Sequence, residues 1–227
     1  MSSPDIIKDF ARVPAAVVQE ASQYQPAILA DVAGRRGALH GRISALRPNM
    51  QFAGSALTVD VRPGDNLMIH AAISLAKPGD VLVIDGKGDL TAALMGTIMM
   101  NACKQVGIAG VVIDGAVRDT LEIEDMGFPV FAAGFNPNGP TKLVPGRIGH
   151  PVTVGGVAVR AGDFVIGDAD GVVVVEREKI ESLLPLAAKK VADETARIAA
   201  IKKGDTAAKW LVPALVAAGV LRQGESL

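Results

Sequence analysis

Short runs of apolar residues alternate with polar turns along this chain, and the turns are rich in glycine and proline. Residues 54–63 alternate apolar and polar side chains with a period of two, which predicts a strand, and residues 66–76 then predict a helix. Continuous apolar runs at 81–84 and 111–113 predict buried strands of a parallel sheet. Residues 90–106 have apolar side chains at helical spacing, so they are predicted to form the crossover helix between those two strands.

Helices are predicted at both ends of the chain. Pro14 and Pro26 each mark the first turn of a helix within the first 35 residues. Residues 178–203 predict a long helix, and residues 206–220 predict a second, largely apolar one, whose surface is typical of a contact with another subunit. Further strands are predicted at 128–132 and 171–176, and residues 152–159 predict a hairpin that turns at Gly155-Gly156. This order of elements predicts one three-layer α/β domain, of the α/β/α or α/β/β type.

Composition narrows the classes of protein to consider. The chain has 227 residues, of which 49% are hydrophobic, so one domain can bury a sizeable core. Its net charge is −1 and its Lys and Arg residues are scattered, which argues against nucleic acid or an anionic membrane as a partner. Neither a signal peptide nor a long apolar span is evident, so we expect a cytoplasmic location. The single cysteine, Cys103, lies among helical apolar residues and is expected to be a packed thiol.

Two kinds of cofactor site are not supported by the sequence. Gly86-x-Gly88 is the one glycine-rich loop after a strand, and it lacks the third glycine and the P-loop lysine of a nucleotide site. His40, His70 and His150 have no metal-ligand spacing, which argues against a zinc site. His40 and His150 are expected in loops, whereas His70 is open to both a structural role and a place at the site or an interface.

Four charged residues follow the apolar run 111–113: Asp114, Arg118, Asp119 and Glu122. Ligands of α/β proteins bind where strands give way to loops, so charges packed at a strand end indicate a site. Asp119 could bind a hard divalent cation, and Arg118 could clamp a substrate carboxylate with its planar guanidinium. A solvated turn and helix cap is the other interpretation, and the local pattern leaves both open.

A second candidate element is the segment from Gly96 to Met99, near the amino end of the predicted crossover helix. The backbone amides of Thr97, Ile98 and Met99 follow a flexible glycine, and free amides near a helix start form a pocket for a carboxylate. The alternative is that Gly96 merely allows close packing of the helix.

Three longer stretches are specific in combination: GSALTVDVRPGDNLMIHAAISLAKPGDVLVIDG, GTIMMNACKQVGIAGVVIDGAVRD and GDFVIGDADGVVVV. With them the chain resembles the RraA-like family over about residues 25–205. Within that family it resembles the class II pyruvate aldolases, which cleave 4-hydroxy-4-methyl-2-oxoglutarate and 4-carboxy-4-hydroxy-2-oxoadipate. The resemblance implies an α-β-β-α fold of the swivelling type and a homotrimer or homohexamer with active sites between subunits.

The resemblance also implies a role for each candidate residue. Arg118 would bind substrate and steady the pyruvate enolate, and Asp119 would hold Mg²⁺ or Mn²⁺, largely through water. The backbone of Gly96, Thr97, Ile98 and Met99 would contact the pyruvyl carboxylate, and Glu194 of a neighbouring subunit would complete the site. The implied activity is metal-dependent cleavage of a small 2-oxo acid to pyruvate, with oxaloacetate decarboxylation at the same site.

Thr97 departs from the family pattern, in which the residue after this glycine is usually Asp or Glu. A threonine hydroxyl can donate a hydrogen bond but cannot act as a base near neutral pH. This departure leaves room for a second reading, because the family also contains non-catalytic proteins that bind and inhibit an endoribonuclease. A methyltransferase, another label used in the family, is disfavoured because no glycine-rich S-adenosylmethionine loop is visible.

Overall fold

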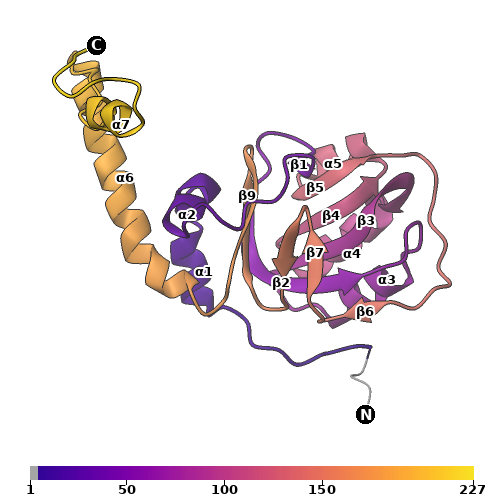
Figure 1. Ribbon diagram of the computed structural model, residues 1–227. Helices are drawn as coiled ribbons and strands as arrows, with labels where there is room; N and C mark the ends of the chain where they lie inside the picture. The colour runs from indigo at the N-terminus through magenta and orange to yellow at the C-terminus, as the bar shows by residue number, and fades with distance from the viewer. Residues whose placement is uncertain (1–4) are drawn as a thin grey trace. The chain divides into compact units, whose positions relative to one another are not determined.

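A computed structural model describes residues 5–227 of the chain (Figure 1). The chain divides into two compact units, Met1–Ala187 and Ala188–Leu227. The sequence predicts a single domain over the whole chain, with a core that spans about residues 25–205. That assignment stays a prediction. Within residues 5–227 no helix has the length and apolar character needed to cross a bilayer.

The first unit is built on a mixed sheet with the strand order β1-β5-β4-β3-β2-β9-β10. Four neighbouring strands at its centre are parallel, as Figure 1 shows: β2 (Phe52–Asp60), β3 (Asp80–Met95), β4 (Gly110–Val117) and β5 (Val130–Phe135). The remaining strands pair antiparallel: β9 (Phe164–Asp168), β10 (Gly171–Val175), β1 (Ser44–Ala45) and β6 (Arg147–Ile148). The parallel strands therefore end at one common edge, which can gather residues distant in sequence.

Three apolar clusters define the layers of this unit. Helices α3 (Leu67–Leu75), α4 (Thr97–Val106) and α5 (Thr120–Met126) pack on one face of the parallel strands. The opposite face packs against β9, β10 and the hairpin of β7 (Val152–Val154) and β8 (Val157–Val159). The outer face of β9 and β10 is covered by α1 (Ala15–Ala21), α2 (Pro26–Val32) and the first turns of α6 (Ile180–Lys202). This α-β-β-α order confirms the predicted mixed α/β fold.

The predicted helix over 90–106 is wrong in its first turns. Residues 90–95 continue β3, which ends at Met95, and α4 begins at Thr97 with Gly96 at its N-cap position. Between Ile84 and Met95 the strand shifts register against β4 several times, starting at the positive-φ residues Lys87 and Gly88. Ala92 to Met95 are buried, and a short continuous apolar run fits a buried strand as well as a helix, so the sequence could not separate the two.

Several local predictions are confirmed. Gly155 and Gly156 both have positive φ and form the tight turn between β7 and β8. Pro26 opens α2 and Pro14 directly precedes α1. Cys103 is fully buried, and burial raises the pKa of its thiol to about 12, so it remains a packed thiol at neutral pH.

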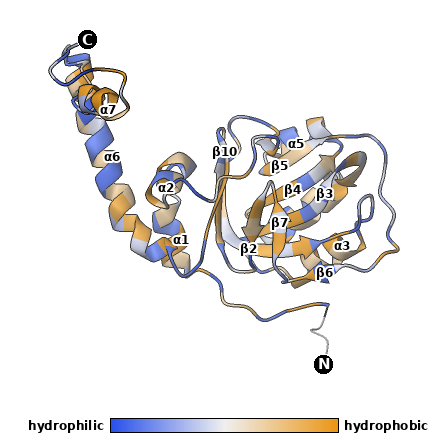
Figure 2. Cartoon of the chain, in the orientation of Figure 1, coloured by the Kyte–Doolittle hydropathy of each residue, from blue (hydrophilic) through white to orange (hydrophobic). Residues whose placement is uncertain are grey.

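The second unit contains the end of α6 and the helix α7 (Leu211–Ala217), which is shorter than the predicted 206–220. Arg197 joins the two segments, because its guanidinium donates to the carbonyl oxygens of Asp205 and Ala207, at 3.0 Å each. Hydrophilic and hydrophobic colours alternate along α6 in Figure 2, and α7 has no buried residue. Packing of this C-terminal segment on a neighbouring subunit stays a prediction.

Candidate functional site

Two strand ends bring the main candidate residues together. Arg118 directly follows β4, and its backbone N–H donates to the carbonyl oxygen of Met95, the last residue of β3, at 3.0 Å. Asp119 then leads into α5, and Gly96 leads into α4. The structure therefore places Arg118 and Asp119 beside the Gly96–Met99 turn, although Arg118 follows Gly96 by 22 positions in the sequence.

Asp119 takes a conformation that serves this meeting point. Its backbone is left-handed, with φ 59° and ψ 41°, an uncommon region for a residue with a side chain. Its Oδ2 accepts a hydrogen bond from the Thr97 amide at 3.0 Å and lies 3.8 Å from Arg118 Nε. Asp119 holds the N-cap position of α5, yet its side chain makes no capping hydrogen bond to that helix. The carboxylate is therefore directed to the neighbouring turn and not to the helix that it precedes.

A cavity of about 130 Å³ lies at this edge, and we call it the strand-end pocket. The side chains of Arg118 and Asp119 are 41% and 38% exposed, so both remain in contact with solvent. Its wall includes residues from the start of α3 and of α4, from the end of β4 and from the irregular segment after β5, among them Asn66, His70, Met99, Arg118, Asp119 and Lys142. The pocket thus combines one carboxylate with two cationic side chains.

The amides of the Gly96–Met99 turn are partly used by the protein itself. The Thr97 amide donates to Asp119, and the Met99 amide donates to the Gly96 carbonyl at 3.1 Å. Of the three predicted amides, only that of Ile98 has no hydrogen-bond partner within residues 5–227. The Thr97 hydroxyl is buried and also unpartnered in this part of the chain, and Thr97 does not line the strand-end pocket.

Two of the four charges after residue 113 do not belong to the pocket. Asp114 is only 3% exposed, and its carboxylate accepts hydrogen bonds from the Arg42 guanidinium and from the Gly155 amide at 2.8 Å. Glu122 lies on the exposed surface of α5 and does not line the pocket. The apolar run suggested a strand ending at 113, whereas β4 continues to Val117, so Asp114 points into the structure instead of the site.

Asn66 and Lys142 are pocket residues that the sequence did not single out as site residues, and His70, whose role the sequence left open, lines the pocket. Burial and the charge of Lys142 both lower the pKa of His70 below its usual value, which favours the neutral imidazole. Lys142 comes from an irregular segment 77 positions away from Asp65, so no local pattern relates it to the strand ends. For Asn66 the sequence did contain a signal, the PGDN turn before α3, which places a polar residue at the start of a helix.

Asp65 holds the segment that carries Lys142. Its Oδ2 accepts hydrogen bonds from the Thr141 hydroxyl at 2.6 Å and from the Leu143 amide at 2.8 Å, and its Oδ1 accepts one from the Leu67 amide at 3.0 Å. Burial opposes ionisation, but these hydrogen bonds and one from the Val144 amide outweigh it and lower the pKa of Asp65 to about 2. The carboxylate therefore fixes the 141–144 segment beside the pocket.

Asp65→Asn is expected to lower the free energy of unfolding by about 2 kcal/mol at pH 7, since a pKa shift of one unit corresponds to roughly 1.4 kcal/mol. Because the folded-state pKa is depressed, this stabilisation is present above the ordinary value of 3.8 and is lost as the pH falls toward about 2. Denaturant unfolding of both proteins between pH 7 and pH 2.5 should show the difference shrinking. A constant difference over that range would contradict the assigned role, and the exposed Asp125→Asn serves as the control.

Gly96 is needed at the site for space. A Cβ atom on Gly96 would overlap Asp119 Oδ2 and lie 3.1 Å from Arg118 Cγ. This contact favours close approach as the role of the glycine, but the groups it approaches are the candidate site residues and not only a packed helix.

Gly96→Ala is expected to lower any turnover at this pocket by about a hundredfold, the typical result of displacing a positioned group by about 1 Å. Gly41→Ala is the matched control, because a Cβ there meets no atom within 4 Å. Steady-state rates and melting temperatures of the three proteins provide the measurement. Full activity in Gly96→Ala would mean that turnover does not depend on the positions of Asp119 and Arg118 seen here.

The side chains at the pocket can be compared with the ligands that the predicted metal requires. Residues 5–227 contain no group of three or more His, Cys, Asp or Glu side chains that could hold an ion. Among residues lining the pocket, Asp119 is the single carboxylate, and its Oδ1 has no hydrogen bond to the described chain. Such a site does not suit four-ligand zinc, but it fits Mg²⁺ or Mn²⁺, which keep several waters and take one or two carboxylates plus substrate oxygens. Metal binding by Asp119 stays a prediction.

Glu194 lies in the second compact unit, in the later part of α6. Its carboxylate forms an ion pair with Lys190, one helical turn earlier, at 2.7 Å. Its predicted role at a neighbouring subunit's site stays a prediction.

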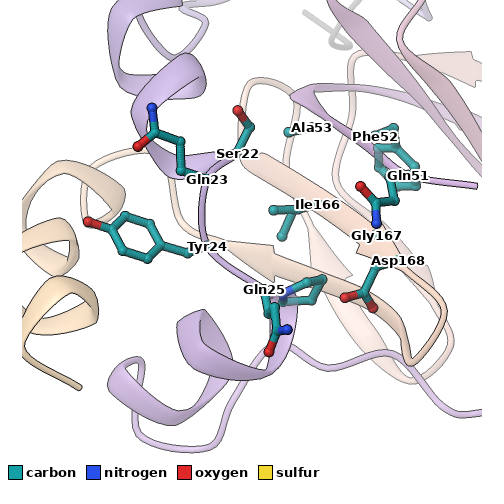
Figure 3. Close-up of a pocket in the computed structure, with 11 residues that line it drawn as sticks. Ser22, Gln23, Tyr24, Gln25, Gln51, Phe52, Ala53, Ile166, Gly167 and Asp168 are labelled. Atoms are coloured by element: carbon teal, nitrogen blue, oxygen red, sulfur yellow. The ribbon is translucent and has the colours of Figure 1, made fainter. Parts of the chain in front are cut away.

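A larger cavity of about 390 Å³ lies elsewhere in the first unit (Figure 3). Figure 3 shows Gln23, Tyr24, Gln25 and Gln51 around it, with Phe52 and Gly167 at its wall. Phe52 begins β2, so this cavity is at the opposite end of the parallel strands from Arg118. Asp168 is its single acidic side chain and no basic side chain lines it, so it does not offer the charge pair of the strand-end pocket.

Taken together, the fold and the strand-end pocket define a mixed α/β protein with a carboxylate and a guanidinium at the ends of adjacent parallel strands. The RraA-like family model, described as Aldolase/RraA, matches residues 15–174. A protein of Halalkalibacterium halodurans, named "Putative 4-hydroxy-4-methyl-2-oxoglutarate aldolase", is 44% identical over 163 residues, which cover 72% of this chain and 78% of that protein. The chain belongs to the RraA-like family.

Solved structures of other members agree with this assignment. RraAS2 of Streptomyces coelicolor, described as an unusual member of the RNase ES inhibitor RraA protein family, is 26% identical, with a TM-score of 0.76 over 83% of this chain and 99% of that one. The RNA-processing inhibitor RraA of Thermus thermophilus is 30% identical, with a TM-score of 0.62 over 66% of this chain and 92% of that one. The relatives therefore include one named as a putative aldolase, one described as an RNA-processing inhibitor and one described as an unusual member of the RNase ES inhibitor family.

Proposed function

We propose that this protein is a divalent-metal-dependent lyase that cleaves 4-hydroxy-4-methyl-2-oxoglutarate, 4-carboxy-4-hydroxy-2-oxoadipate or a similar substrate to pyruvate. Oxaloacetate decarboxylation is proposed as a side activity of the same site. The observation that carries the proposal is the Arg118–Asp119 pair, held against the start of α4 at the rim of the strand-end pocket. The aldolase name of the 44% identical relative supports the same reaction class.

Each of three residues has its own role in the proposed reaction. Asp119 would hold Mg²⁺ or Mn²⁺, which supplies Lewis-acid stabilisation of negative charge on the substrate oxygens. The Arg118 guanidinium would donate two parallel hydrogen bonds to the 2-oxo acid and stabilise the charge of the enolate. The Ile98 amide, at the positive end of α4, is available to the carboxylate of the pyruvyl part.

The bond changes balance without a further reactant. Loss of the 4-hydroxyl proton lets C4 become a carbonyl, while the C3–C4 bond breaks and its electron pair forms the pyruvate enolate. Protonation of C3 then gives pyruvate. In oxaloacetate the C3–C4 bond breaks with release of carbon dioxide, which leaves the same enolate. We assign removal of the hydroxyl proton to water near Glu194 of a neighbouring subunit, since Thr97 offers no base and does not line the pocket.

We further propose a homo-oligomer, trimer or hexamer, that works in the cytoplasm. Apolar side chains around this edge of the sheet support a neighbouring subunit there: Ile98 is 85% exposed and Leu143 is 79% exposed. Leu121 and Phe135 are exposed as well. A native mass equal to one chain would contradict this assembly.

The test of the proposed reaction is pyruvate release from the two aldol substrates and from oxaloacetate, with and without Mg²⁺ or Mn²⁺. We expect metal-dependent release from at least one aldol substrate and from oxaloacetate, and its loss with excess chelator. Absence of pyruvate from all three substrates, or release unaffected by chelator, would contradict the proposal.

The second candidate function is a non-catalytic regulator of an RNA-degrading enzyme. It is favoured by the likeness to an RNA-processing inhibitor and to an unusual member of the RNase ES inhibitor family, and by threonine at position 97, where the aldolases usually have an acid. The retained pair of Arg118 and Asp119 favours the lyase, because a pure binding module does not need it. Inhibition of RNA cleavage by the purified protein, together with no pyruvate release, would reverse this order.

A further inference from the structure

Asn66 lines the strand-end pocket and carries a side-chain acceptor without a partner in residues 5–227. The residue is only 3% exposed, and its Oδ1 is buried without a hydrogen-bond partner in residues 5–227. Buried polar groups are nearly always hydrogen-bonded, so an orphan oxygen on a residue that lines a pocket points to a partner that enters the pocket. The Thr97 hydroxyl is the other such atom, but Thr97 does not line the pocket.

The orientation of the Asn66 amide is fixed by its other contacts. Its Nδ2 donates to the carbonyl oxygen of Leu94 at 2.9 Å and approaches Met99 Sδ at 3.2 Å. Both partners are acceptors. If the nitrogen and oxygen of the amide were exchanged, the oxygen would face these two acceptors and could form a hydrogen bond with neither. Oδ1 therefore stays on the side away from these contacts.

The Asn66 side chain also does not cap the helix that it precedes. It occupies the N-cap position of α3, where an asparagine oxygen ordinarily accepts an amide of the first turn, yet its side chain makes no such bond. The neighbouring Asp65 accepts the Leu67 amide instead, at 3.0 Å. The chain thus leaves the Asn66 oxygen for another partner.

The chemistry of the remaining wall defines that partner. Arg118, Lys142 and the Ile98 amide are donors, which suit carboxylate and carbonyl oxygens of a substrate. Oδ1 of Asn66 is an acceptor, so its partner must carry a proton, and within a bound substrate only a hydroxyl group can supply one. An oxo acid without a hydroxyl has no such group at neutral pH, whereas a 4-hydroxy-2-oxo acid has one.

We propose that Asn66 Oδ1 accepts a hydrogen bond from the 4-hydroxyl group of the aldol substrate and so selects hydroxy-oxo acids over oxo acids that lack the hydroxyl. This inference rests on the proposed lyase function. After cleavage that oxygen is part of a carbonyl and has no proton to donate, so the bond is present with the substrate and absent with the products. Asn66 therefore strengthens binding of the uncleaved substrate and not of the products.

Asn66→Leu tests this, because it removes the acceptor while keeping a side chain of similar size. For the aldol substrates we expect KM to rise and kcat/KM to fall about tenfold, the usual effect of losing one hydrogen bond to a buried group. For oxaloacetate in the same Mg²⁺ buffer we expect kcat/KM to change by less than about threefold. Inhibition by pyruvate, which has no hydroxyl, should be unchanged and shows that the pocket is intact. Asn49→Leu, on an exposed loop, is the matched control.

The other outcomes contradict the inference in distinguishable ways. Equal losses with aldol substrates and oxaloacetate would make Asn66 only a support for Leu94 and Met99. A raised Mg²⁺ requirement in both reactions would assign Oδ1 to a water of the hydrated metal. Wild-type protein that releases no pyruvate from any substrate would overturn the lyase function and this inference with it. If Asn66→Leu does not fold, Asn66→Ala removes the same oxygen with less bulk and carries the same expectations.

Discussion

Asp119→Asn is expected to lower metal-dependent pyruvate release by about a thousandfold, because the Lewis acid that Asp119 is proposed to hold would supply several kcal/mol of transition-state stabilisation and about 1.4 kcal/mol is a tenfold change in rate. The folded structure should survive. Asparagine tolerates the left-handed backbone of position 119, and its oxygen can still accept the Thr97 amide. The side chain is partly exposed, so the substitution leaves no core cavity.

The measurement is kcat across a range of Mg²⁺ concentrations, with the melting temperature of each protein beside it. Asp125→Asn is the control, because it removes an exposed carboxylate from the same helix, α5, six positions away. Wild-type rates in Asp119→Asn at saturating Mg²⁺ would end the assignment of Asp119 as the metal ligand. Loss of activity together with a large fall in melting temperature would show that its role is structural.

Arg118→Lys is the second substitution with a large expected effect, a fall of about a hundredfold in kcat/KM. A lysine keeps the positive charge but cannot make two parallel hydrogen bonds to a carboxylate, and hydrogen bonds to charged groups are each worth roughly 1.5–3 kcal/mol. The surrounding backbone also fits the guanidinium closely, since a Cβ on Gly139 would lie 3.0 Å from Arg118 Nη1.

Rates with oxaloacetate and with an aldol substrate test this expectation, because both proposed reactions would pass through the same enolate. Both should fall by similar factors in Arg118→Lys, in contrast to the selective effect expected for Asn66→Leu. The exposed Arg62→Lys is the control for charge-conserving substitution. Near-normal kcat/KM in Arg118→Lys would mean that Arg118 only stabilises the strand end.

Much of the fold can be read from the order of residues alone. Period-two alternation and apolar runs locate β2, β4 and β10, and the Gly155-Gly156 pair specifies a tight hairpin because both residues adopt positive φ. The GVVIDGAVRD stretch also identified Arg118 and Asp119 as the candidate pair. These features are local, since backbone conformation and side-chain alternation depend on neighbours in the chain.

The limits of the sequence appear where two structures satisfy the same local pattern. The apolar run of residues 92–95 suits a buried strand or a helix, and only pairing with β4 decides that it continues β3 and brings Gly96 to the strand end. The charge at Asp114 looked like part of the site, and only the longer β4 turns it toward Arg42 and Gly155.

The sequence by itself determined the fold family, the Arg118–Asp119 pair and the turn after Gly96, because each is carried by residues close together in the chain. The tertiary structure alone decided which residues share the pocket. Asn66 and Lys142 reach it through the packing of α3 and through the hydrogen bonds of Asp65 to the 141–144 segment. The orphan oxygen of Asn66 is likewise a tertiary property, since it depends on Leu94 and Met99 accepting from Nδ2 and on Asp65 accepting the Leu67 amide. Hydrogen-bond satisfaction depends on neighbours in space, and no pattern of neighbours in sequence reports it.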